Sequence, residues 1–347
     1  MKKETMTGYE RVMAVFHGEQ PDRTPLICPT SIANVECMEL CGAKFPEVHT
    51  DGRKMAELAM TGHDILGFDS VFCYYGVQNE AAAYGAVIDW GKIDEMPKQK
   101  KHALEDPEDF SIPDDIYERP PMKAILDALQ ILKNKYNGKV AVIGKVMGPW
   151  TLSYNLYGTQ EFLMETILDP DRARAFLHAF KEASLDFAFK QVEAGADIIM
   201  WADHATGNLV SAAGYEEFLF PLHQELTRRF HERYPSVPLI LHTCGKTADR
   251  LHLFRETGFD AFHFDSVNDP AQLAAIAGDK IILTGGVNNP RVLLEGTPED
   301  VRQNVIHLLD NGIKLISPEC AIPCRVPNAN LLAIRRTIRE YENIFDE

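Results

Sequence analysis

One histidine and two cysteines carry the clearest chemistry in this sequence. His242 and Cys244 stand two residues apart in the segment LHTCG, and Cys320 follows a separate apolar run in ISPEC. Residues two apart in an extended segment point to the same side, so an imidazole and a thiol can reach one ion. Two thiolates and one imidazole leave a tetrahedral zinc ion with one open position. Cys324 offers an alternative thiol to Cys320, and buried cysteines otherwise serve as small hydrophobic side chains.

An open zinc site with two thiolates favours thiol chemistry over hydrolysis. The two negative charges cancel the charge of the ion, so the ion polarises a bound water poorly. An incoming thiol still loses its proton on coordination, and the resulting thiolate stays nucleophilic at neutral pH. The ligand set therefore predicts attack of a bound sulfur on an activated carbon, which is alkyl transfer. The competing use, hydrolysis by zinc hydroxide, is usually built from histidine and carboxylate ligands.

The elements that must position these ligands alternate regularly along the chain. Eight short apolar runs, bounded by glycine, proline or aspartate, alternate with amphipathic helical stretches. The runs span residues 25–28, 69–73, 139–147, 196–202, 237–242, 259–264, 280–285 and 312–317. Near-continuous apolar strands indicate a buried parallel sheet, and eight of them predict an α/β fold of the (β/α)8 TIM barrel class. A doubly wound open sheet is the alternative, but it usually carries a glycine-rich phosphate loop after its first strand, which this sequence lacks.

The whole chain, residues 1–347, is predicted to form this single barrel domain. Residues 5–60 are interpreted as an N-terminal helical extension around the first apolar run. Residues 84–118 are polar, acidic and rich in proline, which indicates a small insertion with a hairpin after the second strand.

Charge and composition exclude several other classes of protein. The sequence has 35 basic and 51 acidic side chains, a formal net charge of −16, whereas a nucleic-acid binder needs clustered cations. No apolar run reaches the roughly 18 residues of a membrane span, so no membrane segment is expected. Seven cysteines, an odd number, and no secretory leader are typical of a reducing cytosol, which predicts a cytoplasmic protein.

Further polar residues follow the predicted strands, at the end where barrel active sites lie. Asp203 and His204 follow the run at 196–202, and Asp265 follows the run at 259–264. We expect these groups either to hold a zinc ligand in place or to bind the polar tail of a substrate. The sequence leaves open which way His263 points.

Taken together, these segments resemble the uroporphyrinogen decarboxylase superfamily, and within it the corrinoid-dependent methyltransferases of the methylcobamide:coenzyme M type. The similarity covers nearly the whole chain. The zinc motif of that family, His-x-Cys with a distant Cys, falls on His242, Cys244 and Cys320. The other matching segments are ERVMAVFHGEQPDRTP, FCYYGVQNEAAAYGAVIDWG, GKVMGPWTL, YGTQEFL, LHTCGKT, FHFDSVND, LTGGVNNP and ISPECAIP.

The resemblance implies a barrel enzyme that moves a methyl group between a corrinoid and a zinc-bound thiol such as coenzyme M. The cobalamin would be carried by a separate corrinoid protein that docks over the barrel mouth, and superfamily members are often homodimers. Glu80 matches an acidic position of the methyltransferases and is expected to orient the zinc site or the corrinoid, with Asp203 and Asp265 as further catalytic candidates. The residues expected to line the corrinoid site are Tyr74, Met147 and His204.

Two other functions stay open on sequence alone. A decarboxylase of the porphyrinogen kind needs cations for the carboxylates of its substrate, yet residues 29–34, after the first run, contain no arginine. The segment that begins at Cys73 also lacks the acid that the decarboxylases carry as a catalytic aspartate. A non-catalytic corrinoid- or metal-binding protein is the remaining alternative. For a methyltransferase that uses coenzyme M, the nearest cations for its sulfonate are Lys145 and Arg325.

Overall fold

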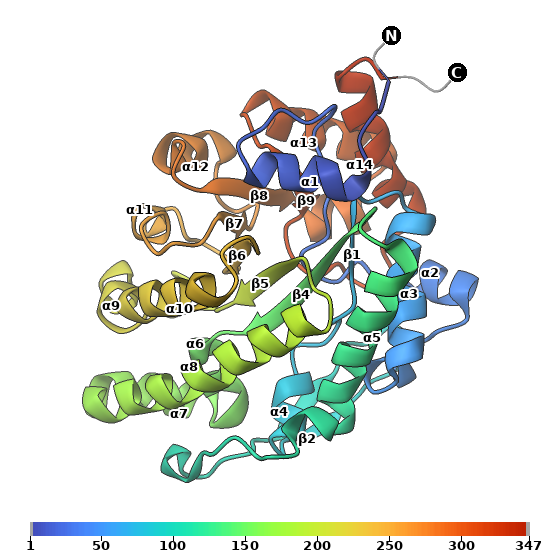
Figure 1. Cartoon of the computed structure of the whole chain (residues 1–347). Helices are drawn as coiled ribbons and strands as arrows, with labels where there is room; N and C mark the ends of the chain where they lie inside the picture. The colour runs from blue at the N-terminus through green and yellow to red at the C-terminus, as the bar shows by residue number, and fades with distance from the viewer. Residues whose placement is uncertain (1–2, 345–347) are drawn as a thin grey trace.

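Seven parallel strands form a continuous curled sheet in the computed structural model, which describes residues 3–344 (Figure 1). Each strand pairs with its neighbours in the parallel direction. In sheet order the strands are β1 (Ser70–Phe72), β4 (Ala141–Met147), β5 (Ile198–Ala202), β6 (Leu239–His242), β7 (Ala261–Phe264), β8 (Ile282–Val287) and β9 (Leu315–Pro318).

The first predicted strand closes the ring between β9 and β1. Leu26 forms an isolated parallel bridge with Ile316 of β9, and the Ile27 N–H donates to the Ile316 carbonyl at 2.9 Å. On the other side, the Asp69 N–H donates to the Leu26 carbonyl at 2.8 Å. Pro25 opens this run and its carbonyl accepts from the Ile316 N–H at 3.0 Å, so the eighth position is a single bridge rather than a regular strand. The (β/α)8 barrel class is therefore confirmed, with its first strand shorter than expected.

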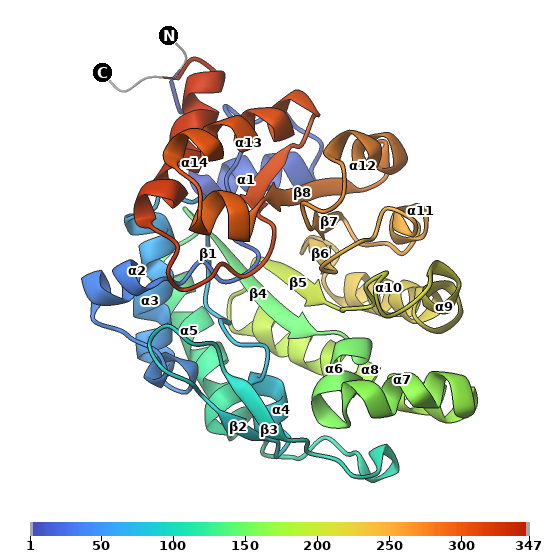
Figure 2. The same cartoon turned by 180° about the vertical axis from the view of Figure 1, so that it is seen from behind.

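Helices cover the outside of the curled sheet, and both chain ends lie at the same end of the molecule (Figures 1 and 2). Six of the helices have proline in their first turn, where its fixed φ suits a helix start. None of the helices within residues 3–344 is both long and apolar enough to cross a membrane. The helices are α1 (Gly8–Phe16), α2 (Val35–Cys41), α3 (Gly52–Asp64), α4 (Asn79–Ala83), α5 (Pro120–Tyr136), α6 (Pro149–Leu156), α7 (Thr159–Leu168), α8 (Pro170–Glu193), α9 (Ala212–Phe218), α10 (Phe220–Arg233), α11 (Leu251–Phe254), α12 (Pro270–Ala277), α13 (Pro298–Asp310) and α14 (Asn328–Tyr341), with a π-helical turn at Asn289–Leu294 and 3-10 turns at Glu47–His49, Pro107–Asp109 and Ile116–Glu118.

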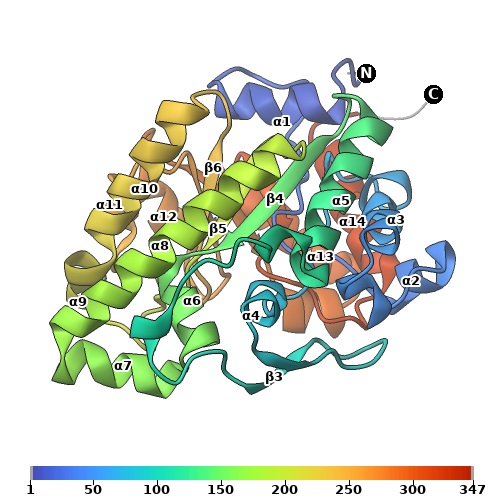
Figure 3. The ribbon, with the colours of Figure 1, turned by 60° about the horizontal axis from the view of Figure 1, so that its bottom comes forward.

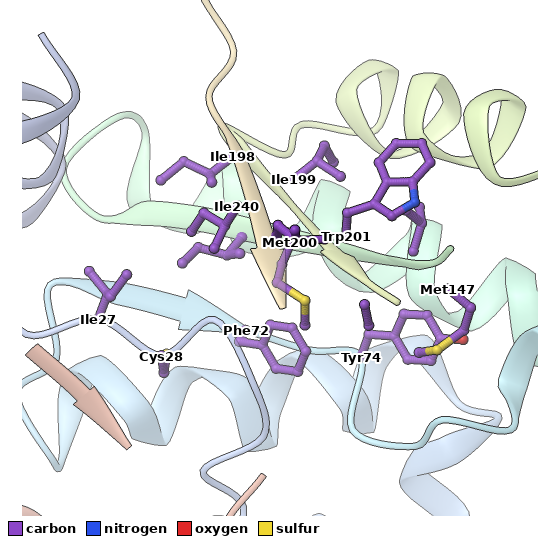
Figure 4. Close-up of a cluster of buried hydrophobic side chains, with 14 of the residues drawn as sticks. Ile27, Cys28, Phe72, Tyr74, Met147, Ile198, Ile199, Met200, Trp201 and Ile240 are labelled. Atoms are coloured by element: carbon purple, nitrogen blue, oxygen red, sulfur yellow. The ribbon is translucent and has the colours of Figure 1, made fainter. Parts of the chain in front are cut away.

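Apolar side chains fill the inside of the barrel. Every residue of β4 and β5 is buried. Met200 of β5 points toward Phe72 of β1, whereas its neighbour Trp201 points to the opposite side of the strand (Figure 4). Strands that alternate in this way between a filled interior and a helix layer are buried on both faces, which explains why they are continuous apolar runs in the sequence.

The predicted insertion forms a two-stranded antiparallel hairpin of β2 (Val87–Asp89) and β3 (Lys98–Lys101). The hairpin lies near α4, on the side of the barrel away from both chain ends (Figures 2 and 3). Its basic run, Lys98–Lys101, is largely exposed on this outer arm. The hairpin expected within residues 84–118 is therefore present.

A buried ion network joins the N-terminal extension to the end of the barrel at which the strands begin. The Arg11 Nη1 donates to Asp69 Oδ1 at 2.6 Å, and the Arg23 Nη1 donates to Asp69 Oδ2 at 2.7 Å. Asp69 directly precedes β1, and both arginines are buried. Asp22 also accepts from Arg11 Nε at 2.6 Å. The PDRTP segment therefore secures the fold at the amino-terminal end of the strands, away from the ends where a barrel active site forms.

Candidate metal centre

Two strands deliver three metal-ligating side chains to one point at the barrel mouth. His242 ends β6, Cys244 follows it by two residues, and Cys320 lies two residues beyond β9. The Cys244 Sγ is 3.1 Å from His242 Nε2 and 3.3 Å from Cys320 Sγ, and the Cys320 Sγ is 3.7 Å from His242 Nε2. Zinc bonds of about 2.0–2.3 Å in a tetrahedron place donor atoms roughly 3.5–3.8 Å apart. The three donor atoms therefore lie close enough to share one ion.

A second imidazole holds His242 in place. His263 of β7 lies opposite His242 in the strand register, and their Nδ1 atoms are 2.8 Å apart. The Nε2 of His263 donates to the Pro318 carbonyl at 2.7 Å. Both rings are buried, and the hydrogen bonds direct the Nε2 of His242 toward the two sulfur atoms. An outer partner of this kind is typical of metal-binding histidines.

Burial keeps the histidine donor neutral, and a hydrogen bond between the two thiols shifts their pKa values in opposite directions. The pKa of His242 is lowered well below its usual value, first by burial and then by the neighbouring His263 and His204, so its ring is neutral. A hydrogen bond from Cys244 to Cys320 raises the pKa of the Cys244 thiol and lowers that of Cys320. The proton between the two sulfur atoms is the one that a metal ion replaces on binding. Two thiolates and a neutral imidazole fit a zinc ion.

Carboxylates hold the loops that carry the two cysteines. Asp265 accepts from the backbone N–H groups of Gly245 and Val267, each at 3.0 Å. Because Gly245 directly follows Cys244, this contact fixes the backbone at the first sulfur. Glu319, which is buried, accepts from two backbone N–H groups of neighbouring loops at 2.8 and 2.9 Å. Glu319 directly precedes Cys320 and fixes the second sulfur in the same way.

The structure brings Cys320, and not Cys324, to the donors on β6. The Cys324 sulfur faces the insertion hairpin, where it lies 4.0 Å from the Met96 sulfur. Burial raises the pKa of Cys324 to about 11, which keeps it a thiol at neutral pH. Of the other cysteines, Cys28, Cys37 and Cys73 are buried in the hydrophobic core and Cys41 packs against it.

Asp203, which follows β5, belongs to a buried hydrogen-bonded network outside the group of sulfur ligands. Its Oδ1 accepts from the Thr151 N–H at 2.8 Å, and its Oδ2 lies 3.0 Å from His223 Nε2. The His223 Nδ1 in turn lies 2.8 Å from the Tyr215 hydroxyl. This network ties the end of β5 to α6, α9 and α10. Both carboxylate oxygens are thus occupied, and Asp203 acts on the site through the backbone that it anchors.

His204 lies beside two of the three candidate ligands, His242 and Cys244. Its ring meets the ring of His242 edge to face, with centroids 5.5 Å apart. One of its nitrogens lies within 4.8 Å of the donor atoms of His242 and Cys244. Burial lowers the pKa of His204 to about 4, so this ring is also neutral near pH 7.

Glu80 forms a second polar group, together with Tyr74 and Met147. The Glu80 Oε1 accepts from the Tyr74 hydroxyl at 3.1 Å and from the Met147 N–H at 2.8 Å. Burial raises the pKa of Glu80 to about 7. The side chains of Tyr74 and Met147 are buried and belong to the cluster of buried side chains drawn in Figure 4. The structure thus groups both residues with Glu80.

Lys145 of β4 is a buried cation near both groups. Its Nζ donates to the Gly76 carbonyl at 2.9 Å and lies 4.0 Å from the centre of the Tyr74 ring. Burial lowers the pKa of Lys145 to about 7. Its charge lowers the pKa of both Glu80 and Cys320, so it acts electrostatically on one of the candidate metal ligands and on the carboxylate.

Comparison with known proteins places this geometry in a family. A model of the uroporphyrinogen decarboxylase (URO-D) family matches residues 7–341. The chain belongs to the uroporphyrinogen decarboxylase family.

Relatives of this member of the uroporphyrinogen decarboxylase family include methyltransferases. A methylated-thiol–coenzyme M methyltransferase from Methanosarcina mazei is 30% identical over 96% of this chain and 90% of its own length. A methylcobamide:CoM methyltransferase from Methanosarcina acetivorans is 31% identical over 97% of this chain and 100% of its own length. The solved structure of a methyltransferase from Methanosarcina mazei has a TM-score of 0.92 at 27% identity, over 97% of this chain and 99% of that one.

Two residues of this candidate site, His263 and Glu319, received no role from sequence analysis. His263 contacts His242 only because β6 and β7 pair in a register that sets the two histidines opposite each other. Nothing in a single sequence specifies that register. Glu319 carried a weak signal, since a glutamate next to a candidate ligand at a strand end is a natural group to hold that ligand.

Proposed function

We propose that this chain is a methyltransferase that moves a methyl group between a corrinoid, carried by a partner protein, and a small thiol activated at a zinc ion. The observation that carries the proposal is the meeting of His242 Nε2 with the sulfur atoms of Cys244 and Cys320, at 3.1–3.7 Å. The names of two relatives support it, because both are methyltransferases that act with coenzyme M.

The residues of the chain prepare the site for a thiol rather than for water. Zinc held by His242, Cys244 and Cys320 would stabilise the thiolate form of an incoming thiol at neutral pH. The two cysteines supply the negative charge that makes bound water a poor nucleophile. Burial of His242 keeps its ring neutral and available as a ligand. Hydrolysis is the weaker alternative, because none of the three ligands is a carboxylate and only one is a histidine.

The cation Lys145 near the site favours a small thiol that carries an acidic group at its far end. Lys145 is buried, donates one hydrogen bond to a backbone carbonyl, and acts electrostatically on Cys320. A sulfonate or carboxylate at the far end of a small thiol, as in coenzyme M, would neutralise this charge. Arg325 is a poorer candidate, because it pairs with Asp94 and its side chain is 75% exposed.

Glu80, Asp203 and Asp265 act in this proposal as positioning groups. Asp265 fixes the backbone after Cys244, and Asp203 fixes the backbone before His204. Glu80 accepts two hydrogen bonds, and the charge of the nearby Lys145 lowers its pKa.

The proposal also implies a partner protein and a cellular compartment. A corrinoid protein would present its cobalamin at the barrel mouth, where His242 and the two cysteines lie. A reducing cytoplasm suits the chain, because its seven cysteines are free thiols. A homodimer stays a prediction.

The proposal is tested with the purified chain, methylcobalamin and a set of small thiols. We expect one zinc ion per chain, and methylation of the thiol with appearance of the cob(I)alamin spectrum. Cys244→Ala should lose the zinc ion and the methyl transfer together, whereas Cys324→Ala, whose sulfur faces the hairpin, should keep both.

Three results would contradict the proposal. Full methyl transfer by metal-free protein would remove the role of the ion. Release of carbon dioxide from uroporphyrinogen without added metal would favour a decarboxylase. Tight cobalamin binding with no turnover of any thiol would favour a non-catalytic binding protein.

A further inference from the structure

His49, which ends the 3-10 turn Glu47–His49, is a buried imidazole without a polar partner. The residue is 0% exposed, yet within residues 3–344 neither Nδ1 nor Nε2 makes a hydrogen bond. Its ring is stacked on Phe45 and on Trp90, with centroids 4.4 and 5.5 Å away. Burial lowers the pKa of His49 to about 4, so the ring is neutral near pH 7 and one nitrogen carries a lone pair. His49 therefore offers an unused hydrogen-bond acceptor on a ring that is held in place.

A second unused acceptor lies beside the first. Asn79, at the start of α4, is 1% exposed, and its Nδ2 donates to the His49 carbonyl at 2.8 Å and to the Pro121 carbonyl at 3.4 Å. These bonds fix the amide, so its Oδ1 is the atom left without a partner. A Cβ added at Gly76 would lie 2.7 Å from this oxygen and 3.6 Å from His49 Nδ1. The two acceptors therefore converge on the backbone at Gly76.

Lys145 supplies a cation at the same point. Its Nζ donates to the Gly76 carbonyl at 2.9 Å, and two further N–H groups of the ammonium are left for another acceptor. The charge of Lys145 lowers the pKa of both His49 and Cys320, so it acts on this polar group and on the metal centre alike. The far end of a thiol that contacts Lys145 therefore comes next to the two acceptors at Gly76.

Two acceptors beside a cation define the chemistry of the ligand. Asn79 Oδ1 and the lone pair of His49 each need a hydrogen-bond donor, whereas Lys145 needs an anion. An ammonium group next to a carboxylate satisfies all three. The sulfonate of coenzyme M would meet Lys145 but offers only acceptors, so it would leave the Asn79 oxygen buried without a partner, which is unfavourable.

We propose that His49, Asn79 and Lys145 bind the far end of the substrate and that the preferred substrate is an α-amino acid that carries a thiol. This inference rests on the proposed function, because it assigns the class of thiol that is methylated. The ammonium group of the ligand donates to Asn79 Oδ1 and His49 Nδ1, and its carboxylate accepts from Lys145 Nζ. The thiol at the other end of the ligand is then left for the metal centre, and the recognition itself makes and breaks no covalent bond.

Two thiols that differ only in the amino group test the inference. Homocysteine and 4-mercaptobutanoate have the same chain length and the same carboxylate. With the purified full-length chain, loaded with zinc and supplied with methylcobalamin, we expect kcat/KM to be about 10–100-fold higher for homocysteine, because the other thiol leaves two buried acceptors without a donor.

The two failures are distinguishable. Methylation of both thiols with equal kcat/KM, or with a preference for 4-mercaptobutanoate, would overturn this inference and leave the proposed function intact. No methylation of any thiol would overturn the proposed function and this inference with it.

Substitutions at the two ends of the polar group test its residues. His49→Phe keeps an aromatic ring in the stack but removes both nitrogens, so the preference for homocysteine should fall about tenfold. Gly76→Ala should lower it too, because the added methyl group would contact the Asn79 oxygen, and it guards against a folding defect in the first variant. His252→Phe, at an exposed position of α11, is the matched control and should keep the full preference. An unchanged preference in both His49→Phe and Gly76→Ala would overturn the inference.

Discussion

The rings of His242 and His263 face each other through their Nδ1 atoms, 2.8 Å apart. Only one of these nitrogens can carry the proton between them. His263 already donates from Nε2 to the Pro318 carbonyl, which accepts but cannot donate, so its Nδ1 is the bare acceptor. The proton therefore lies on the Nδ1 of His242. This arrangement leaves the lone pair of His242 Nε2 directed at the two sulfur atoms, as a metal ligand requires.

Substitution of His263 by Asn or by Gln tests whether His263 holds the proton on the Nδ1 of His242 or only packs against its ring. The oxygen of His263→Asn lies near the position of Nδ1 and can still accept from His242. The amide of His263→Gln reaches the Pro318 carbonyl instead and leaves the Nδ1 of His242 with only the backbone carbonyl of residue 263, at 3.2 Å, as an acceptor. We expect zinc affinity, measured by competition with a coloured chelator, to fall about 10–100-fold in His263→Gln and less in His263→Asn. Equal affinity in both variants and the unchanged chain would show that the contact does not orient His242.

The two cysteines after β9 should differ sharply in their effect on metal binding. Cys320→Ser removes a sulfur that lies 3.3 Å from Cys244, so we expect loss of stoichiometric zinc. Cys324→Ser changes a sulfur that contacts Met96, so zinc content should stay at one per chain. Metal analysis after gel filtration measures both. Retention of zinc by Cys320→Ser together with loss from Cys324→Ser would reverse the ligand assignment.

The barrel could be predicted from the sequence because a short local pattern indicates each strand and helix, and these patterns alternate along the chain. Each strand of the parallel sheet is a short apolar run, and several of the helices that follow, such as α6, α9 and α12, begin with a proline or a capping side chain. The ligands were found for the same reason: His242 and Cys244 are adjacent on one side of an extended segment, and Cys320 follows a strand end.

The remaining site residues depend on register and burial, which one sequence does not specify. His263 reaches His242 only because β6 and β7 pair with those two residues opposite each other. His223 lies in a helix whose pattern is amphipathic, and its contact with Asp203 is visible only in three dimensions. Likewise, an exposed glutamate and a buried one look alike in sequence, so the burial of Glu80 had to come from the structure.

Glu80 should make stability depend on pH. Its pKa is raised by burial from 4.5 to about 7, so the folded chain holds a proton that the unfolded chain releases between pH 4.5 and 7. Stability from this group is full below pH 4.5 and is lost as pH rises to about 7. Glu80→Gln is neutral at every pH and avoids this loss. As pH rises from 4.5 to 7, its free energy of unfolding should therefore increase relative to that of the unchanged chain, by up to about 3 kcal/mol.

Urea unfolding at a series of pH values measures this difference. Glu295→Gln, at an exposed position, serves as the matched control and should follow the unchanged chain throughout. A difference between Glu80→Gln and the unchanged chain that stays constant from pH 4.5 to 8 would show that Glu80 does not titrate in this window.

Lys145 should select thiols by the charge of their tails. Lys145→Met removes the charge but keeps the length of a buried side chain, so we expect KM for 2-mercaptoethanesulfonate to rise about tenfold, the equivalent of roughly 1.4 kcal/mol. KM for the neutral 2-mercaptoethanol should change little, because it offers no charge to the lysine. Arg325→Gln, which alters an exposed ion pair with Asp94, should leave both values unchanged.

The pH dependence of KM identifies Lys145 as the cation responsible. Because burial lowers its pKa to about 7, the lysine is charged below pH 7 and loses its charge above it. KM for the acidic thiol should therefore rise as pH increases from 6 to 8 in the unchanged chain. Lys145→Arg keeps its charge over this range and should flatten the profile. An equal rise for the acidic and the neutral thiol in all variants would trace the effect to a group other than Lys145 and remove Lys145 from substrate selection.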